Sequence, residues 1–142
     1  MDRQTKQAVS EAQAASEAEA RAVAQVVERY FQAIHHGDTA GLGAVFHPSA
    51  TLIGWDEGKL RHVTLERWFR FVENIPSPAS QGAECDGKIL AIDVTGTAAM
   101  VKVSETYRAF HYVDYLSLVK VDDGWRIVGK CYHQTALGGS IA

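Results

Sequence analysis

The chain has 142 residues, of which 46% are hydrophobic and 22% charged, and its formal net charge at pH 7 is -3. A chain of this length and composition can bury one ordinary core without disulfides or a structural metal, so we expect a single domain. The acidic balance provides no basic field for nucleic acid, and we expect no nucleic-acid partner.

The cysteine content and the start of the chain indicate a cellular compartment. Cys85 and Cys131 match neither a disulfide framework nor a zinc site, so we expect reduced thiols. The first residues contain no apolar core of a signal peptide, and no apolar run reaches the length of a membrane span. We therefore expect a cytoplasmic protein that does not associate with membranes.

The first third of the chain predicts helices. Residues 1–18, rich in Ala, Gln and Glu, predict a helical or frayed extension that could face a partner. From about Glu19 to His36, apolar side chains recur at helical spacing, at Val23, Val26, Val27, Tyr30, Phe31 and Ile34. Gly37 ends this helix, and Asp38 is expected to cap a short second helix that Pro48 stops.

The middle of the chain predicts a short hairpin, a helix and a loop. Residues 50–55 and 59–63 are typical of two strands joined across Asp56-Glu57-Gly58. Thr64 then caps a third helix, whose inner side is expected to carry Leu65, Trp68, Phe69 and Val72. Residues 74–87, with two prolines, predict a long loop of the kind that often forms a functional rim.

Four long strands follow. Residues 88–94 and 98–110 predict one hairpin, and residues 112–121 and 125–133 predict another across Asp123-Gly124. Helices first and strands last indicate an α+β domain over residues 19–136: a cone-shaped, curved antiparallel sheet with three helices packed on its concave face. Such a cone leaves a cavity suited to a small molecule. Residues 137–142 predict a flexible tail.

The last hairpin carries the most informative pattern. If Asp123-Gly124 is a two-residue turn, Asp114 lies opposite His133, and one face holds Asp114, Leu116, Leu118, Ile127, Cys131 and His133. A one-residue bulge would break this register. The other face holds Tyr115, Ser117, Val119, Val121, Val128, Lys130 and Tyr132. Its apolar members need a cover, so we expect a homodimer through the convex face of the sheet.

Two stretches resemble a known superfamily. Val-Val-Glu-Arg-Tyr-Phe-Gln-Ala-Ile-His-His-Gly-Asp, followed by Ala-Val-Phe-His-Pro-Ser-Ala-Thr-Leu, resembles the opening of the nuclear transport factor 2-like, or ketosteroid-isomerase-like, superfamily. The close, from Val113 to Lys130, is similar to the branch catalogued as putative lumazine-binding proteins. The resemblance covers roughly residues 20 to 134 and implies the cone fold.

The resemblance also implies candidate site residues. The superfamily's isomerases place an oxyanion-hole tyrosine on the first helix and a protonated aspartic acid on the third long strand, and Tyr30 and Asp114 match these positions. Apolar surroundings raise the pKa of such an acid, which can then donate a hydrogen bond to a developing enolate. The family's general-base aspartate has no counterpart, because this chain has Gly54 and Trp55 at that point.

A histidine is the candidate for moving a proton. Beside Asp114, His133 would be held in one tautomer and its cation stabilised, while His47 or His62 could replace the missing base from the cavity mouth. The expected pocket wall comprises Trp55, Trp68, Tyr107, Leu116, Leu118 and Cys131. The six histidines show no metal-binding spacing, so we expect neither a metal nor a cofactor.

Each role has a structural alternative. Tyr30 could be a core tyrosine, Asp114 could bond to His133 or Lys130, and His133 could lie in solvent. We therefore carry two functional hypotheses for a protein that binds a small hydrophobic or aromatic ligand. One is a cofactor-free lyase, isomerase or hydrolase in which Tyr30 and Asp114 polarise an oxygen. The other is a non-catalytic ligand-binding or dimerisation module.

Overall fold

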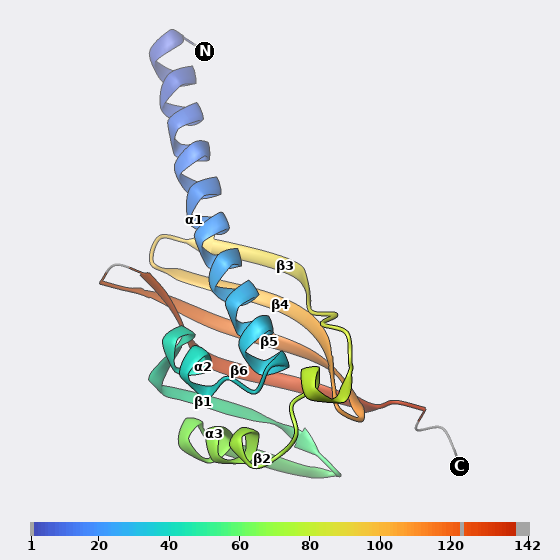
Figure 1. The fold of residues 1–142 in the computed structure, drawn as a ribbon. Coiled ribbons are helices and arrows are strands. Elements are labelled where there is room, and N and C mark those ends of the chain that lie inside the picture. The colour runs from blue at the N-terminus through green and yellow to red at the C-terminus, as the bar shows by residue number, and fades with distance from the viewer. Residues whose placement is uncertain (1, 123, 139–142) are drawn as a thin grey trace.

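The computed structural model describes residues 2–122 and 124–138 (Figure 1). The predicted tail falls mostly on residues 139–142, which lie outside the described residues. In chain order the elements are α1 (Arg3–His35), α2 (Thr39–Val45), β1 (Phe46–Asp56), β2 (Lys59–Thr64), α3 (Leu65–Glu73), a 3-10 turn η1 (Ala79–Gln81), β3 (Lys88–Thr95), β4 (Ala98–Tyr107), β5 (Phe110–Val121) and β6 (Gly124–Ala136).

The six strands form one curved sheet in the order β2-β1-β6-β5-β4-β3, and the helices lie on one of its faces (Figure 1). The predicted α+β cone is confirmed. Neighbouring strands are antiparallel except β1 and β6, which pair in parallel. These two strands are not consecutive in the chain, so no hairpin forces them to run in opposite directions.

Helix α1 is a single helix of 33 residues that includes the predicted extension. Asp2 caps it by accepting a hydrogen bond from the Thr5 backbone N–H at 2.8 Å. Its N-terminal turns are exposed and project beyond the sheet (Figure 1). Farther along, Glu19 accepts hydrogen bonds from Lys120 Nζ at 2.8 Å and Trp125 Nε1 at 3.0 Å, which ties the helix to the β5–β6 hairpin.

The predicted caps and short hairpin are confirmed. Asp38 accepts a hydrogen bond from the Gly41 backbone N–H at 2.9 Å, and Thr64 accepts one from Arg67 at 3.2 Å. Strands β1 and β2 pair from Asp56 opposite Lys59 to Thr51 opposite Thr64. Helix α2 ends at Val45, and Pro48 lies within β1.

None of the helices in the described part of the chain is long and apolar enough to cross a membrane.

The register of the β5–β6 hairpin differs from the prediction. Val121 pairs with Gly124, so the connection lies one residue earlier than Asp123-Gly124; Asp123 itself lies outside the described residues. The register then shifts between Ser117 and Leu118, which leaves one extra residue in β6. Such a bulge changes which side chains of the strand face the core.

The bulge reverses the predicted faces of β6 beyond Ile127. Asp114 lies opposite Tyr132 rather than His133, and His133 pairs with Val113. Lys130 is buried on the inner side, whereas Cys131 and His133 are exposed on the outer side. The predicted pairing of Asp114 with His133 is therefore wrong, and a lysine takes the inner position.

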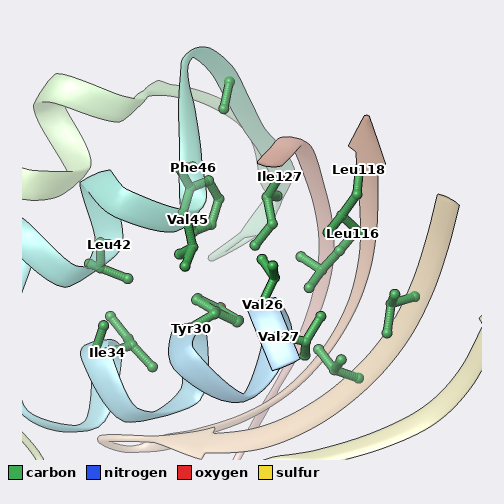
Figure 2. Packing of buried hydrophobic residues seen from close by; sticks show 14 of the residues in the cluster. Val26, Val27, Tyr30, Ile34, Leu42, Val45, Phe46, Leu116, Leu118 and Ile127 are labelled. Atoms are coloured by element: carbon green, nitrogen blue, oxygen red, sulfur yellow. The ribbon is translucent and has the colours of Figure 1, made fainter. Parts of the chain in front are cut away.

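The hydrophobic core lies between the helices and the inner face of the sheet (Figure 2). Helix α1 contributes its buried apolar stripe, α2 contributes Leu42 and Val45, and the sheet contributes Leu116, Leu118 and Ile127. These side chains form a continuous cluster because every second residue of a strand points to the same face.

Replacing Leu116 with alanine tests this packing. Leu116 is fully buried, so we expect Leu116→Ala to lower the free energy of unfolding by about 2–5 kcal/mol. Ser117→Ala changes the neighbouring exposed residue of β5 and should alter it by no more than about 0.5 kcal/mol. Urea denaturation measures both. Equal losses for the two variants would contradict the assigned faces of β5.

Candidate functional site

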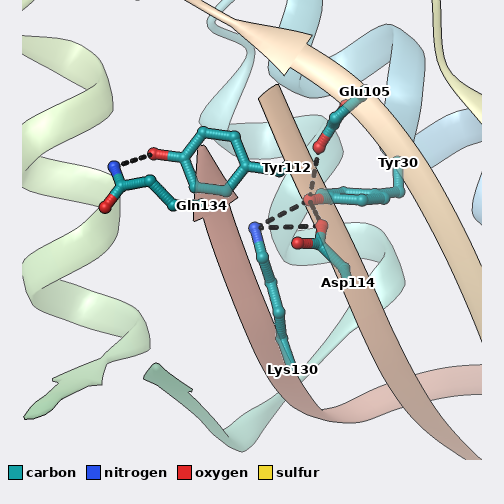
Figure 3. A network of polar contacts seen from close by, with 6 residues as sticks. All are labelled: Tyr30, Glu105, Tyr112, Asp114, Lys130 and Gln134. Atoms are coloured by element: carbon teal, nitrogen blue, oxygen red, sulfur yellow. Dashed lines mark hydrogen bonds and ion pairs between the residues drawn. The ribbon is translucent and has the colours of Figure 1, made fainter. Parts of the chain in front are cut away.

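Four polar side chains meet inside this core around one hydroxyl group (Figure 3). Tyr30 Oη of α1 lies 2.9 Å from Glu105 Oε1 of β4 and 3.2 Å from Asp114 Oδ2 of β5. Lys130 Nζ of β6 donates a hydrogen bond to the same hydroxyl at 2.8 Å. We call Tyr30, Glu105, Asp114 and Lys130 the polar cluster.

The polar cluster is withdrawn from solvent. Tyr30 and Asp114 are fully buried, while Glu105 and Lys130 expose 6% and 9% of their surface. Burying charged groups is costly unless they are paired, and Lys130 Nζ lies 3.6 Å from Asp114 Oδ2. Among the described residues, Asp114 Oδ1 is buried without a hydrogen-bond partner. The cluster therefore retains an acceptor that no described residue uses.

The hydrogen bonds of Tyr30 determine where protons can lie. A phenol has one proton to donate, and its oxygen also accepts from Lys130. Tyr30 can therefore donate to Glu105 or to Asp114, but not fully to both. When both contacts are hydrogen bonds, one carboxyl group must carry a proton and donate it to the phenol oxygen.

Electrostatics identify Glu105 as a carboxyl group that can hold this proton at neutral pH. Burial is the largest influence, Lys130 opposes it and Asp114 adds to it, and together they raise the pKa of Glu105 to about 7. Burial also raises the pKa of Asp114, against the effect of Lys130. The pKa of Tyr30 is raised well above its ordinary value by burial, so its hydroxyl stays neutral. A carboxyl group that titrates near neutral pH can give or take a proton.

A cavity of about 660 Å³ lies next to the polar cluster. Its wall includes Trp68 of α3, Tyr112 of β5 and Tyr132 and Gln134 of β6. Lys130 Nζ lies 4.7 Å from the centre of the Trp68 ring and 6.0 Å from that of Tyr112. Gln134 Nε2 donates a hydrogen bond to Tyr112 Oη at 3.2 Å (Figure 3). Two aromatic residues of the cavity wall therefore lie beside the ammonium group.

Some predicted site residues are where the sequence indicated. Tyr30 Oη and Asp114 Oδ2 lie 3.2 Å apart in the interior, but neither residue lines the cavity, whereas Trp68 and Tyr107 do. Leu116 and Leu118 point inward but belong to the solid core. The catalytic roles of Tyr30 and Asp114 stay a prediction.

Other predicted positions are wrong. Trp55 is 63% exposed on the outer face, because it occupies the outward position of β1 next to Gly54. Cys131 and His133 also face outward, because of the bulge in β6. His62 is exposed opposite Ile53.

Gly54, where the resemblance would place a general base, has a structural reason to be glycine. A Cβ atom on Gly54 would lie 2.7 Å from the ring of Tyr132 and 2.6 Å from its carbonyl oxygen. The Tyr132 ring thus occupies the space that a side chain at residue 54 would need. His47 is the other histidine considered as a general base. Its Nδ1 lies 2.7 Å from Ser49 Oγ, and the residue does not line the cavity.

The sequence prediction missed Glu105 and named Lys130 only as an alternative partner of Asp114, which is the pairing that the structure has. Glu105 follows Val101 and Val103 at inward positions of β4, so strict alternation along that strand could have identified it. Strict alternation predicts Lys130 on the outer face, because the bulge leaves no clear mark in the sequence. Within residues 2–122 and 124–138, no group of three or more His, Cys, Asp or Glu side chains is arranged to hold a metal ion.

Removing the buried cation tests the pairing within the cluster. We expect Lys130→Met to lower the free energy of unfolding at pH 8 by about 3–5 kcal/mol, because it leaves buried carboxyl groups without a counter-charge. A carboxyl whose pKa is raised in the folded state stabilises the fold below its unfolded pKa and loses this effect as pH rises. The penalty should therefore be smaller at pH 5 than at pH 8.

Urea denaturation at both pH values measures this difference. Lys102→Met is a matched control, since Lys102 lies on the outer side of β4 over the Tyr115 ring. A loss for Lys130→Met that equals the loss for Lys102→Met, or that does not change with pH, would rule out the proposed charge pairing.

Comparisons with known proteins agree with this architecture. Residues 18–133 match the model of a family described as "Putative lumazine-binding". A protein of Cladobotryum sp. named "Aldolase FrzH" is 28% identical over 106 residues, which cover 73% of this chain and 82% of that protein.

Solved structures give the same result. An NTF2-like protein of unknown function from Shewanella baltica has a TM-score of 0.70 and 27% identity, over 81% of this chain and 92% of its own. An NTF2-like protein of unknown function from Methylobacillus flagellatus has a TM-score of 0.68 and 27% identity, over 82% of this chain and 91% of its own. The chain belongs to the family described as putative lumazine-binding, within the NTF2-like superfamily.

Proposed function

We propose that this protein binds a small aromatic or hydrophobic molecule bearing a carbonyl group, and that it is a cofactor-independent lyase or isomerase. The observation that carries this proposal is the position of the polar cluster. A cation, a neutral phenol and two carboxyl groups with raised pKa meet around one hydroxyl group. The cation lies 4.7 Å from the centre of the Trp68 ring, which belongs to the wall of a cavity large enough for a small ligand. The aldolase-named relative supports chemistry at a carbonyl group.

The residues of the cluster suit an enolate intermediate. Lys130 would donate a hydrogen bond to the carbonyl oxygen of the ligand and stabilise the negative charge that develops there. Glu105 or Asp114 in its ionised form would accept the proton through Tyr30. Tyr30 holds the two carboxyl groups and the ammonium group in position, because its hydroxyl forms a hydrogen bond with each of them.

The same groups can support an aldol-type cleavage. A carboxylate takes the proton of a hydroxyl group on the β carbon, whose oxygen then forms a C=O bond to that carbon while the bond between the α and β carbons breaks. The electron pair of that bond moves into the enolate, whose oxygen faces Lys130. The carboxyl group then returns its proton to the enolate carbon. One aldehyde or ketone and one carbonyl product are released, and no oxidant or reductant is needed.

The ligand's oxygen must pass the Trp68 and Tyr112 rings to reach the cluster. Lys130 lies against both rings and has a flexible four-carbon side chain, so its ammonium group can turn toward the cavity. Asp114 Oδ1 would then remain available as an acceptor.

A ligand-binding protein without turnover is the second candidate. It is favoured by the same geometry, because the Tyr30 hydroxyl already has three partners and no residue of the polar cluster lines the cavity. In that case the cluster stabilises the floor of the cavity, and binding does not require Lys130 to move.

A screen of aromatic β-hydroxy ketones for retro-aldol cleavage separates the two candidates. For a substrate that is cleaved, we expect Lys130→Met and Tyr30→Phe to lower kcat/KM by about 10²–10³, because each removes a group that acts on the transition state. Lys102→Met should cleave at the parent rate. Circular dichroism checks that each variant is folded.

The results decide between the candidates as follows. Cleavage at the parent rate by both folded cluster variants would overturn the proposed mechanism. Binding of these ketones by isothermal titration calorimetry, without any cleavage between pH 5 and pH 9, would favour the ligand-binding protein.

We also propose that the protein forms a homodimer through the outer face of the sheet. This face carries large hydrophobic side chains that are 38% to 63% exposed: Ile53, Trp55, Leu60, Met100, Tyr115 and Val119. Trp55 lies opposite Leu60, and Tyr115 lies in register with Cys131, which pairs with Ile53. These neighbours form a contiguous apolar surface across four strands, which is typical of an interface.

Charge on this face should prevent dimerisation. We expect the parent protein to sediment as a dimer at about 50 μM, a concentration at which a micromolar interface is mostly occupied. The double variant Trp55→Glu/Tyr115→Glu should sediment as a monomer. Phe71→Glu, at an exposed residue on the cavity side, should leave the dimer intact. A monomeric parent in analytical ultracentrifugation would contradict the proposal.

A further inference from the structure

The rim of the cavity carries an unequal set of charges. Arg61, Arg67 and Arg108 line the cavity, and so do the carboxylates Asp56 and Glu57. These residues come from the β1–β2 hairpin, helix α3 and the β4–β5 turn. Positive charge is therefore brought to one opening by three separate elements, although the chain as a whole is acidic.

The arginines differ in whether the protein already uses them. Arg61 Nε lies 4.0 Å from Asp56 Oδ2, so these two charges face each other. Among the described residues, the guanidinium groups of Arg67 and Arg108 form no ion pair and no side-chain hydrogen bond. Apart from the Arg61–Asp56 pair, the charged groups of the described cavity wall are thus two guanidinium groups, of Arg67 and Arg108, and one carboxylate, of Glu57.

The backbone of Arg108 indicates that the fold does not require this side chain. Its φ is +58°, in the left-handed region that residues other than glycine adopt at a cost of about 1–2 kcal/mol. Glycine would fit this turn with less strain. The arginine instead adds a positive charge beside Phe110 and Tyr112, both of which line the cavity.

The remainder of the wall is aromatic. Trp68, Phe71, Tyr107, Phe110, Tyr112 and Tyr132 all line the cavity. Flat ring systems pack well against such a wall, and guanidinium groups bind carboxylates and similar anions through two parallel hydrogen bonds. The polar cluster does not add a strong negative charge that would repel an anionic ligand. The ammonium group of Lys130 faces Asp114, and the pKa of Glu105 is raised to about 7.

We propose that the ligand of this cavity is an aromatic acid whose anionic group binds Arg67 and Arg108. This inference rests on the proposed function and names the class of its ligand. The anionic group lies at the rim and the ring system against the aromatic wall. The carbonyl group is thereby directed inward to Lys130, so the two arginines set both the selectivity and the orientation of the ligand.

Two dyes that differ in charge test the inference. 8-Anilino-1-naphthalenesulfonate is an aromatic anion, and N-phenyl-1-naphthylamine has the same rings without the sulfonate. We expect the parent to bind the anion at least about 10-fold more tightly in fluorescence titrations, since charge-assisted hydrogen bonds exceed neutral contacts by this amount. Arg67→Gln/Arg108→Gln should abolish that preference by weakening binding of the anion alone.

Arg70→Gln is the matched control. Arg70 lies on the same helix as Arg67 and is also exposed, but it pairs with Glu66 at 3.8 Å and does not line the cavity. It should bind both dyes like the parent. Near-UV circular dichroism checks that every variant keeps the parent's packing, because the anionic dye also binds loosened proteins.

Three other results would count against the inference. Equal affinity of the parent for the two dyes would overturn the anionic ligand and leave the carbonyl-binding cavity of the proposed function intact. An effect of Arg70→Gln as large as that of the double variant would also overturn it, since the preference would then reflect overall charge. Failure of both dyes to bind would overturn the aromatic cavity and the proposed function together.

Discussion

The buried ammonium group of Lys130 is the feature on which the rest of the structure depends. Such a charge is stable in the interior only with a nearby counter-charge, which Asp114 supplies, and with hydrogen bonding, which Tyr30 provides. The rings of Trp68 and Tyr112 lie beside this ammonium group and also form part of the wall of the cavity. Stability and the candidate chemistry are thus served by the same contacts.

The bulge in β6 connects the fold to this site. Without the extra residue, strict alternation after Ile127 would direct Cys131 and His133 inward and leave Lys130 outside. With it, the lysine enters the core beside Asp114, and Tyr132 packs over Gly54. The bulge in β6 therefore places Lys130, rather than His133, beside Asp114. It also places the Tyr132 ring over Gly54.

Much of the fold could be predicted from the sequence, because its signals are local. The apolar stripe of α1 and the caps Asp38 and Thr64 each depend on residues within one or two helical turns. The inward position of Asp114 followed from alternation within β5. Lys130 could not be placed, because its face depends on the pairing of two strands across a bulge that no residue type announces. The sequence also does not show that Arg67 and Arg108 line one cavity, since they are far apart in the chain and are brought to it only by folding.

The coupling within the polar cluster can be measured directly at Glu105. Carbon-13 NMR of its side-chain carboxyl, followed from pH 4 to pH 9, gives its titration midpoint in the parent and in Lys130→Met. We expect a midpoint near 7 in the parent and a higher one in the variant, because loss of the cation disfavours the carboxylate. A midpoint near the ordinary value of 4.5, unchanged by Lys130→Met, would contradict a buried cluster built around this lysine.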